Sequence, residues 1–258
     1  MEDLLAHARV KCPFCEQQGH NTKKKNLALY EDGSYRCYRC RTKGSDHKKL
    51  EKLFQTAIFT PPKPRDTFPV FTPLFRHEKY IGYWNYLRKR GFTRRHIGDS
   101  GVGVLSTRRF YVSFPIRWHK VLLGFFSRGI TSREFPQHYL DPDVDREKIV
   151  YNMDAVMLHD KPVFIVESVM DAVINGLDRT VATLGKELCD PQFRLMCKWF
   201  IGREVIVAFD GDAYDDVDAL TGRFRMNGIN AFPAYLPPCE DACSINGKLE
   251  RFIRKEKK

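Results

Sequence analysis

Three acidic residues directly follow two apolar stretches that have the length of buried strands. Val163–Val166 precedes Glu167, and Val205–Phe209 precedes Asp210-Gly211-Asp212. Continuous apolar stretches of this kind are typical of a parallel sheet covered on both faces, and sites in such sheets form at the carboxyl ends of the strands. We therefore expect Glu167, Asp210 and Asp212 to lie together. Their like charges are costly unless a cation binds between them, and oxygen ligands suit magnesium or manganese. The alternative is that the aspartates only end a strand and cap the next helix.

Two Cys-x-x-Cys pairs lie near the start of the sequence. They are Cys12 with Cys15 and Cys37 with Cys40. Each pair offers two thiolates at one turn, and two pairs complete a closed tetrahedral zinc site. Because a segment of this size cannot build a sufficient core alone, we predict a small β-type zinc ribbon over residues 1–54 that holds one structural zinc ion. The remaining cysteines show no second paired spacing, and we interpret them as ordinary thiols: Cys189, Cys197, Cys239 and Cys243.

Basic and aromatic residues surround the two cysteine pairs. They are Lys23, Lys24, Lys25, Tyr30, Tyr35, Arg36, Tyr38, Arg39 and Arg41. Basic groups neutralise phosphates and tyrosines offer faces to unstacked bases, so this pattern indicates binding of single-stranded nucleic acid. The alternative is a purely structural ribbon with a solvated basic face.

Charge is distributed unevenly along the 258 residues. The formal net charge is +11, with +5 in residues 1–60, +8 in residues 61–158 and −2 in residues 159–258. A basic front and an acidic back favour a protein that holds a polyanion in one part and a metal in another. No apolar run is long enough to span a membrane and the N-terminus lacks a signal-peptide pattern, so we expect a cytoplasmic protein with reduced cysteines and no membrane partner.

The pattern of elements divides the chain into four parts. After the ribbon, the Pro-rich residues 55–65 are expected to form an extended linker. Residues 66–158 carry a helix over Tyr80–Arg90 and a hairpin with strands Arg109–Ile116 and Lys120–Ser127. Residues 159–258 alternate strands with helices, one of them opened by a Ser168–Asp171 capping box and another capped by Asp190 with Pro191 at its first position. The predicted fold class is therefore α+β with an α/β parallel-sheet unit.

Together these features resemble DnaG-type bacterial and phage primases across nearly the whole chain. The order of ribbon, linker, basic middle segment and acidic βα unit is the same. Segments that resemble the family are Arg36–Asp46, Phe114–Arg117, Gly124–Gly129, Val181–Gly185, and those around Glu167 and Asp210-Gly211-Asp212. The resemblance implies that residues 66–158 begin an RNA polymerase core and that residues 159–258 form a Toprim-like catalytic domain. Ser168 stands where the family has glycine, and Ala213-Tyr214 where it has Ala-Gly.

The resemblance also implies an activity: synthesis of short RNA primers on single-stranded DNA from ribonucleoside triphosphates. Glu167, Asp210 and Asp212 match the acids that hold catalytic magnesium or manganese, and Asp241 matches a later aspartate whose position Glu240 could fill instead. Residues that match or lie near positions on the template and nucleotide path are Arg117, Arg128, Tyr139 and Lys148, with His138 replacing a lysine. In the ribbon, Tyr38, Arg39 and Arg41 would contact template bases.

Other functions remain open at this level. No P-loop is present, so a replicative helicase would be a separate chain, and the length suits a stand-alone phage primase. One alternative is a Toprim-type nuclease or topoisomerase-like enzyme, although no tyrosine stands out as a nucleophile. Another is a RecR-like, non-catalytic DNA-binding protein with a zinc ribbon and a Toprim fold, although such proteins lack the long basic middle segment.

Overall fold

The computed structural model describes residues 8–10, 12, 15, 26–29, 34–44, 67–74, 80–118, 121–185, 188–245 and 248–254. The chain divides into two compact units, Met1–Pro61 and Pro62–Lys258, which are treated separately below. The predicted linker over residues 55–65, the lysines at 23–25 and Tyr30 lie outside the described residues.

The first unit contains a small antiparallel sheet. Its strands, in the order β1-β2-β3-β4, are Ala8–Val10, Leu27–Leu29, Tyr35–Cys37 and Lys43–Gly44. Leu27 and Tyr35 are buried together with the cysteines. A Cβ atom on Gly44 would lie 2.6 Å from the Tyr35 ring, so the small residue allows the ring to fill the core. Tyr35 is therefore a packing residue rather than an exposed platform for a base.

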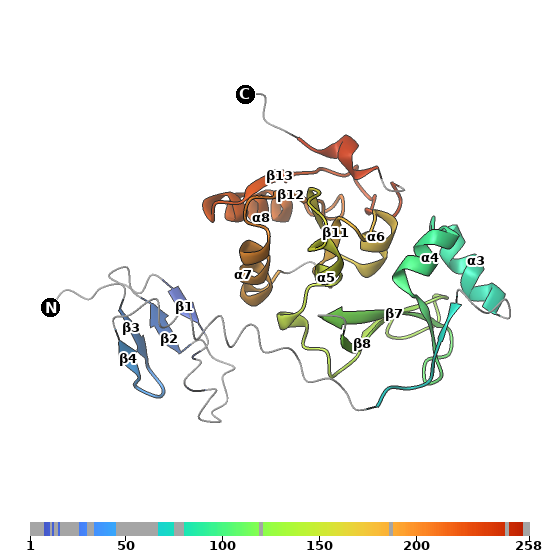
Figure 1. Cartoon of the computed structure of the whole chain (residues 1–258), viewed down its shortest axis with the longest axis horizontal. Helices are drawn as coiled ribbons and strands as arrows, with labels where there is room; N and C mark the ends of the chain where they lie inside the picture. Colours follow the sequence, from blue (N-terminus) through green and yellow to red (C-terminus); the bar gives the residue numbers. More distant parts are fainter. Residues whose placement is uncertain are drawn as a thin grey trace. The chain divides into compact units, whose positions relative to one another are not determined.

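The second unit begins with a five-stranded antiparallel sheet. The strands, in the order β5-β6-β7-β8-β9, are Phe71–Pro73, Gly103–Leu105, Tyr111–Trp118, Val121–Gly129 and His138–Leu140. Strands β7 and β8 form the predicted hairpin. Its first strand begins later than predicted, because Phe110 adopts a positive φ of 65° that interrupts an extended strand. Helices α3 (Ile81–Lys89) and α4 (Arg94–Ser100) lie beside this sheet (Figure 1).

A four-stranded parallel sheet forms the rest of the second unit. Its strands, in the order β11-β10-β12-β13, are Thr180–Ala182, Val163–Val166, Glu204–Val207 and Asn230–Pro233. Helices α6 (Val169–Ile174), α7 (Asp190–Trp199) and α8 (Tyr214–Met226) surround it (Figure 1). Shorter helices are α5 (Met153–Val156), η3 (Arg146–Lys148) and η4 (Leu249–Phe252). The predicted fold class is confirmed.

The strand order creates a switch point between β10 and β12. The connection from β10 through α6 leads outward to β11, whereas the connection from β12 through α8 leads in the opposite direction to β13. Because crossovers in parallel sheets are right-handed, α6 and α8 must cover opposite faces. The loops that follow β10 and β12 therefore diverge, and they leave a crevice at the carboxyl edge of the sheet.

Apolar packing explains why this edge is held firmly. All four residues of β10 are buried, as are Val205, Ile206 and Val207 of β12. Between α7 and α8, the Phe193 and Phe224 rings pack with centroids 4.9 Å apart. No described helix is long and apolar enough to cross a membrane.

Two local expectations change. Helix α7 has Cys189 rather than Asp190 at its N-cap, so Asp190 is its first residue and Pro191 its second, and Asp190 accepts an ion-pair contact from Arg223 at 2.6 Å. Strand β12 ends at Val207, so Asp210-Gly211-Asp212 lies in the loop beyond it.

Gly211 allows this loop to approach the chain that follows β13. A Cβ atom on Gly211 would lie 2.0 Å from the carbonyl oxygen of Pro237, and the Gly211 amide donates to the carbonyl of Glu240 at 2.9 Å. The glycine is thus needed because two backbone segments meet there.

We expect Gly211→Ala to lower the free energy of unfolding by about 1–3 kcal/mol, the usual range for overpacking. Gly222→Ala is the matched control, because Gly222 lies in α8 and a Cβ atom there would meet nothing within 4 Å. Ala in a helix interior is favoured over Gly by about 1 kcal/mol, so the control should be neutral or stabilising. Equal urea midpoints for the two variants would contradict the close approach.

Candidate functional site

Two carboxylates meet at the crevice between β10 and β12. Glu167 directly follows β10 and is only 6% exposed, and the backbone amide of Asp210 donates to its Oε1 at 3.2 Å. The loop after β12 is therefore fastened to the residue that ends β10. This hydrogen bond places Asp210 beside Glu167, as the strand pattern predicts.

Asp171 is a third acid at this edge, and the sequence interpretation treated it as a capping residue only. It does cap α6, because its carboxylate accepts from the amide of Ser168 at 3.2 Å and from the Ser168 hydroxyl at 2.6 Å. It is also 3% exposed, and its charge acts on Asp210. Glu167 precedes the N-cap of α6, so helical spacing does not relate the two residues and the sequence gives no signal for this second role.

The segment after β13 supplies the remaining members of the cluster. The ligand atoms of Asp171, Asp241 and Cys243 all lie within 4.8 Å of one another. The Asn175 side-chain amide donates to the carbonyls of Asp171 and Ala242 at 2.9 and 2.7 Å, so it fastens this segment to α6. Asp241 therefore brings its carboxylate into the cluster, whereas Glu240 contributes its backbone carbonyl to Gly211.

Asp212 stands at the outside of the cluster. It is exposed, and its charge is the smallest of the influences on Asp210. Asp215 and Asp216 are exposed in the first turn of α8, where acidic residues favour the positive end of a helix. The inner group is thus Glu167, Asp171, Asp210, Asp241 and Cys243, which we call the acidic cluster.

The acidic cluster has the electrostatics of a site that takes a cation. Burial, and then the neighbouring charges of Asp171 and Glu167, raise the pKa of Asp210 to about 7. Burial also raises the pKa of Asp171 to about 6. Asp210 Oδ1 is buried and has no hydrogen-bond partner among the described residues. Carboxylate oxygens with an open acceptor position fit a divalent ion such as magnesium or manganese.

Basic residues at the end of α3 and on β8 and β9 adjoin the acidic cluster. The Cys243 thiol donates to the carbonyl of Arg90 at 3.2 Å, which joins the two surfaces. Burial and the charges of Arg128 and Arg90 lower the pKa of His138. Arg108 stacks on the Tyr139 ring with its guanidinium carbon 3.0 Å from the centroid. Tyr139 pairs with Ser127 and His138 pairs with Arg128, so Arg108 and Tyr139 lie on the other face of the sheet from Arg128 and His138. We call Arg90, Arg128 and His138 the arginine patch.

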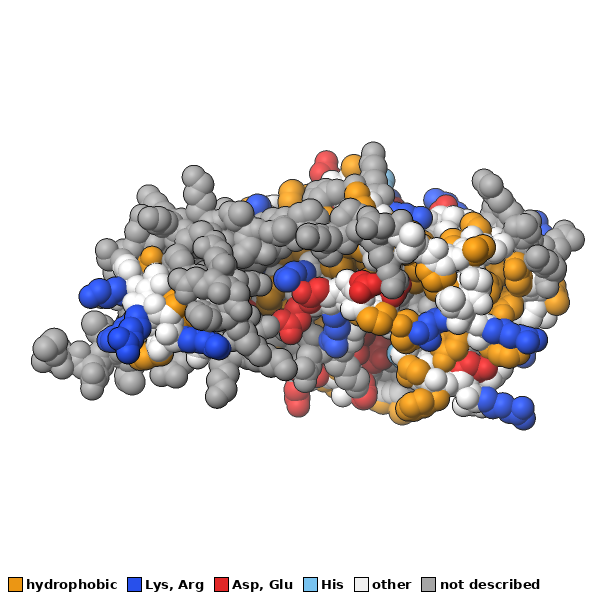
Figure 2. All heavy atoms as spheres, turned by 90° about the horizontal axis from the view of Figure 1, so that it is seen from below, with side chains coloured by type: hydrophobic (Ala, Val, Ile, Leu, Met, Phe, Trp, Pro, Cys, Tyr) orange, Lys and Arg blue, Asp and Glu red, His pale blue; other side chains and the backbone are white. Residues whose placement is uncertain are grey.

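The arginine patch has unused capacity to bind an anion. Arg128 Nε is buried and has no hydrogen-bond partner among the described residues. Figure 2 shows one face of the molecule, on which Lys and Arg side chains lie among hydrophobic ones. Guanidinium groups beside aromatic rings suit a nucleic-acid strand, whose phosphates and bases they can contact.

Two residues that the resemblance assigns to the nucleic-acid path lie elsewhere. Arg117 lines a groove of about 1380 Å³ together with Lys161 and Asp178, which precede β10 and β11. This groove is at the amino edge of the parallel sheet, opposite the acidic cluster. Lys148 lies in η3 and pairs with Asp145 at 2.9 Å. Of the residues that the resemblance assigns to this path, Arg128 lies with Arg90 and His138, whereas Tyr139 is on the other face of the sheet and Arg117 and Lys148 lie elsewhere.

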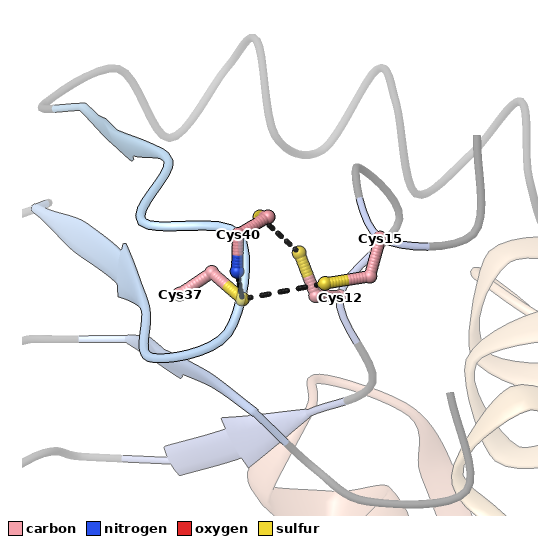
Figure 3. A group of neighbouring side chains, drawn as sticks. All are labelled: Cys12, Cys15, Cys37 and Cys40. Carbon is pink, nitrogen blue, oxygen red and sulfur yellow. Dashed lines mark hydrogen bonds between the residues drawn. The ribbon is translucent and has the colours of Figure 1, made fainter. Parts of the chain in front are cut away.

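The four predicted zinc ligands converge in the first unit (Figure 3). Cys12 Sγ lies 3.6 Å from Cys40 Sγ, and Cys15 Sγ lies 3.6 Å from Cys37 Sγ. Bonds of about 2.3 Å from a tetrahedral zinc ion place sulfurs about 3.8 Å apart, so these distances fit zinc.

Hydrogen bonds from neighbouring groups orient the second cysteine pair, Cys37 and Cys40. The backbone amides of Arg39 and Cys40 each lie 3.4 Å from Cys37 Sγ, and such donors stabilise a thiolate. For Cys40, burial alone would raise the pKa of the thiol, but hydrogen bonds from the Thr42 side chain and backbone lower it to about 6. Metal ligation requires thiolates, so these contacts favour an occupied site.

The turn that carries Cys37 and Cys40 also presents the predicted nucleic-acid contacts to solvent. Tyr38 is 55% exposed, and Arg36 lies over its ring at 5.9 Å. Arg39 and Arg41 are exposed, and Arg41 adopts a positive φ of 60°. The surface of the turn is thus basic and aromatic, as the sequence indicates.

The described structure is similar to solved DnaG primase structures. The zinc-binding and RNA polymerase domains of the Aquifex aeolicus primase align with 94% of this chain and 76% of their own, at a TM-score of 0.55 and 17% identity. The RNA polymerase domain of the Mycobacterium tuberculosis primase DnaG aligns with 81% of this chain and 83% of its own, at a TM-score of 0.59 and 13% identity. A DnaG catalytic domain bound to ssDNA aligns with 80% of this chain and 77% of its own, at a TM-score of 0.57 and 18% identity.

These similarities establish a shared fold, so the resemblance to DnaG-type primases is confirmed at the level of the fold. No protein-family model matches the chain. No curated protein matches its sequence.

We expect one zinc ion per chain and loss of the first unit's structure when the ion is lost. In Cys37→Ser, zinc content measured by atomic absorption should fall, and amides of residues 26–44 should lose protection in hydrogen exchange, because structural zinc contributes about 10–16 kcal/mol of binding free energy in small zinc domains. Cys197→Ser on α7 is the control, since Cys197 lies outside the cysteine group. A protected ribbon in a zinc-free chain would contradict the site.

Asp210→Asn should stabilise the metal-free chain above pH 7. In an unfolded chain an aspartate has a pKa of about 4, whereas here it is about 7. The native state therefore binds more protons between these values, so stability falls as pH rises through this window and the loss is complete above pH 7. Asn removes this loss, so Tm at pH 8 should exceed that of the metal-free wild type, with no difference near pH 4.

The exposed Asp215→Asn is the control and should leave this pH profile unchanged. Added manganese should raise the Tm of the wild type and of Asp215→Asn but not that of Asp210→Asn. A wild-type Tm that rises between pH 4 and 7 with no change in Asp210→Asn would show that Asp210 is not buried among carboxylates.

Proposed function

We propose that this chain is a DNA primase, which synthesises short RNA primers on single-stranded DNA from ribonucleoside triphosphates. The observation that carries the proposal is the acidic cluster at the switch point of the parallel sheet, joined through the contact between Cys243 and Arg90 to the arginine patch. A polymerase needs a metal-binding group beside a track for a polyanion, and the two surfaces meet at this contact. The similar fold of DnaG primase structures supports the same function.

Four parts would share the work. Residues 1–54 are the zinc ribbon, residues 55–65 a linker, residues 66–158 the basic part of the polymerase core, and residues 159–258 the Toprim-like catalytic domain. The division of the chain between Pro61 and Pro62 falls inside the proposed linker. The linker would let the ribbon reach a template held by the catalytic part.

The acidic cluster would hold magnesium or manganese. Glu167, Asp210 and Asp241 supply carboxylates from three separate segments, and Asp212 adds one at the exposed rim. Two such ions, when bound, stabilise the attacking and leaving oxygens of nucleotidyl transfer. The chain's own part is positional, because the Glu167 contact and Gly211 fix where Asp210 stands. Because its pKa is raised to about 7, Asp210 would release a proton when an ion binds near neutral pH.

The arginine patch would hold the template next to the reacting groups. Arg128 would pair with a phosphate through its unpartnered Nε. The stacked Arg108 and Tyr139, on the other face of the same sheet, would contact a base outside the reaction centre. Arg117 and Lys148 lie away from this patch, so we assign them to nucleic acid outside the reaction centre. Tyr38, Arg39 and Arg41 of the ribbon would contact a few template bases.

The proposal implies several partners. Single-stranded DNA and ribonucleoside triphosphates are the substrates, a replicative helicase would be a separate chain, and the site of action would be the cytoplasm. The resemblance and the surface charge support these expectations.

The test is RNA synthesis from labelled ribonucleotides on a mixed library of single-stranded DNA with magnesium or manganese. Asp210→Ala should lower the yield at least about a hundredfold, because lost electrostatic stabilisation of the transition state has that scale. Its affinity for single-stranded DNA should stay unchanged, since the arginine patch is intact. Asp215→Ala is the matched control, and it should synthesise as the wild type does.

Full synthesis by Asp210→Ala would refute the metal assignment. Cleavage of labelled DNA without nucleoside triphosphates would instead support a Toprim-type nuclease. DNA binding without synthesis or cleavage, in the zinc-loaded chain and at both metal ions, would support a non-catalytic binding protein.

A further inference from the structure

The acidic cluster contains one thiol among its carboxylates. The sulfur of Cys243 lies within 4.8 Å of ligand oxygens of both Asp171 and Asp241. Cys243 is 4% exposed and Asp171 is 3% exposed, so the pair is nearly closed to solvent. Three potential ligands from two segments thus converge on one point, and one of them is sulfur.

The backbone around Cys243 holds its side chain in this place. The Asn175 amide binds the carbonyl of Ala242 at 2.7 Å, and Ala242 lies between Asp241 and Cys243 in the sequence. The Cys243 thiol donates to the Arg90 carbonyl at 3.2 Å. Neither contact uses a lone pair of the sulfur, so the sulfur keeps its capacity to bind a metal.

A buried cysteine often serves only as a small apolar residue. Such a position is surrounded by carbon atoms, because carboxylates are costly to bury beside an apolar group. Cys243 instead lies beside two carboxyl groups, and it is close enough to Asp210, whose Oδ1 has no hydrogen-bond partner among the described residues, to be affected by its charge. These surroundings are those of a ligand set rather than of an apolar core.

We propose that Cys243 is a metal ligand that makes this end of the acidic cluster select manganese, cobalt or zinc over magnesium. Magnesium takes oxygen ligands and binds thiolates poorly, whereas softer divalent ions accept a mixed set of thiolate and carboxylate. On binding, the thiol loses its proton to solvent and its hydrogen bond to Arg90, and sulfur donates to the ion. The inference deepens the proposed function, on which its biological meaning rests, because it names the ion that this site prefers.

The experiment titrates the zinc-loaded full chain with cobalt(II), without DNA or nucleotides. Cobalt bound to sulfur gives a charge-transfer absorption, whereas cobalt bound to carboxylates alone does not. Zinc binds such sites more tightly than cobalt, so the ribbon keeps its zinc and adds no signal. We expect a saturable absorption that corresponds to one cobalt ion per chain and is absent in Cys243→Ser.

Matched variants locate the signal. Cys239→Ser changes an exposed thiol four positions away, and Cys197→Ser changes a half-buried thiol on α7, so both should keep the full absorption. Cys243→Asp should lose the absorption and still bind an ion. Its preference for cobalt over magnesium, measured by competition, should fall by at least about tenfold, the scale on which changed ligand surroundings alter metal affinity.

A saturated wild-type chain without sulfur-to-cobalt absorption would overturn the proposal, and this result needs no variant to fold. An absorption that persists in Cys243→Ser would also overturn it, as would an unchanged metal preference in Cys243→Asp. Because the readout needs no synthesis, the two ideas fail separately. Primer synthesis without the absorption refutes only the role of Cys243, and the absorption without synthesis refutes only the primase.

Discussion

Repulsion among buried carboxylates is the constraint on which the rest of this structure depends. Glu167 and Asp171 are almost fully buried, and Asp210 is held against Glu167 by its own backbone amide. Burial limits how far water can screen these charges, so the raised pKa of Asp210 and of Asp171 reflects the cost of ionising them without a cation. Apolar strands, a helix cap and the Gly211 contact together hold the groups against that repulsion. A bound cation would be attracted by all of these carboxylates, so the arrangement that causes their repulsion would also favour cation binding.

The acidic cluster and the arginine patch meet where the segment after β13 contacts the end of α3. The segment after β13 carries Asp241 into the acidic cluster, and two residues later Cys243 touches the carbonyl of Arg90. Beyond Arg90 lie Arg128 and His138. A strand of nucleic acid on this patch would thus have its phosphates on arginines and its end near the carboxylates. The opposite charges are held by separate elements, because Arg90 ends α3 whereas the segment with Asp241 is fastened to α6 by Asn175.

Strands and helices were predictable where the local sequence showed a single clear hydrophobic pattern. The apolar stretches before Glu167 and Asp210 indicated a parallel sheet, and alternation with helices fixed the fold class. The cysteine spacing predicted the ribbon because four thiols carried on two turns match the ligand set of a tetrahedral zinc ion. Asp171 and Cys243 could not be placed, since their roles depend on how α6 and the segment after β13 meet in space. A capping box explains Asp171 completely within the sequence, and that local explanation hid its second role.

At low sequence identity, a resemblance predicts the fold more reliably than it predicts the positions of individual side chains. Arg117 and Arg128 both match family positions and lie on adjacent strands of one hairpin, yet Arg117 lines the groove at the amino edge of the parallel sheet. Arg128 instead faces His138 beside the acidic cluster. The difference follows from the alternation of side chains along the hairpin. Arg128 lies opposite Val112, and Arg117 is five positions beyond Val112 on β7, so the two arginines project from opposite faces of the sheet. An odd number of positions along a strand is thus enough to separate two positive charges that both match family positions.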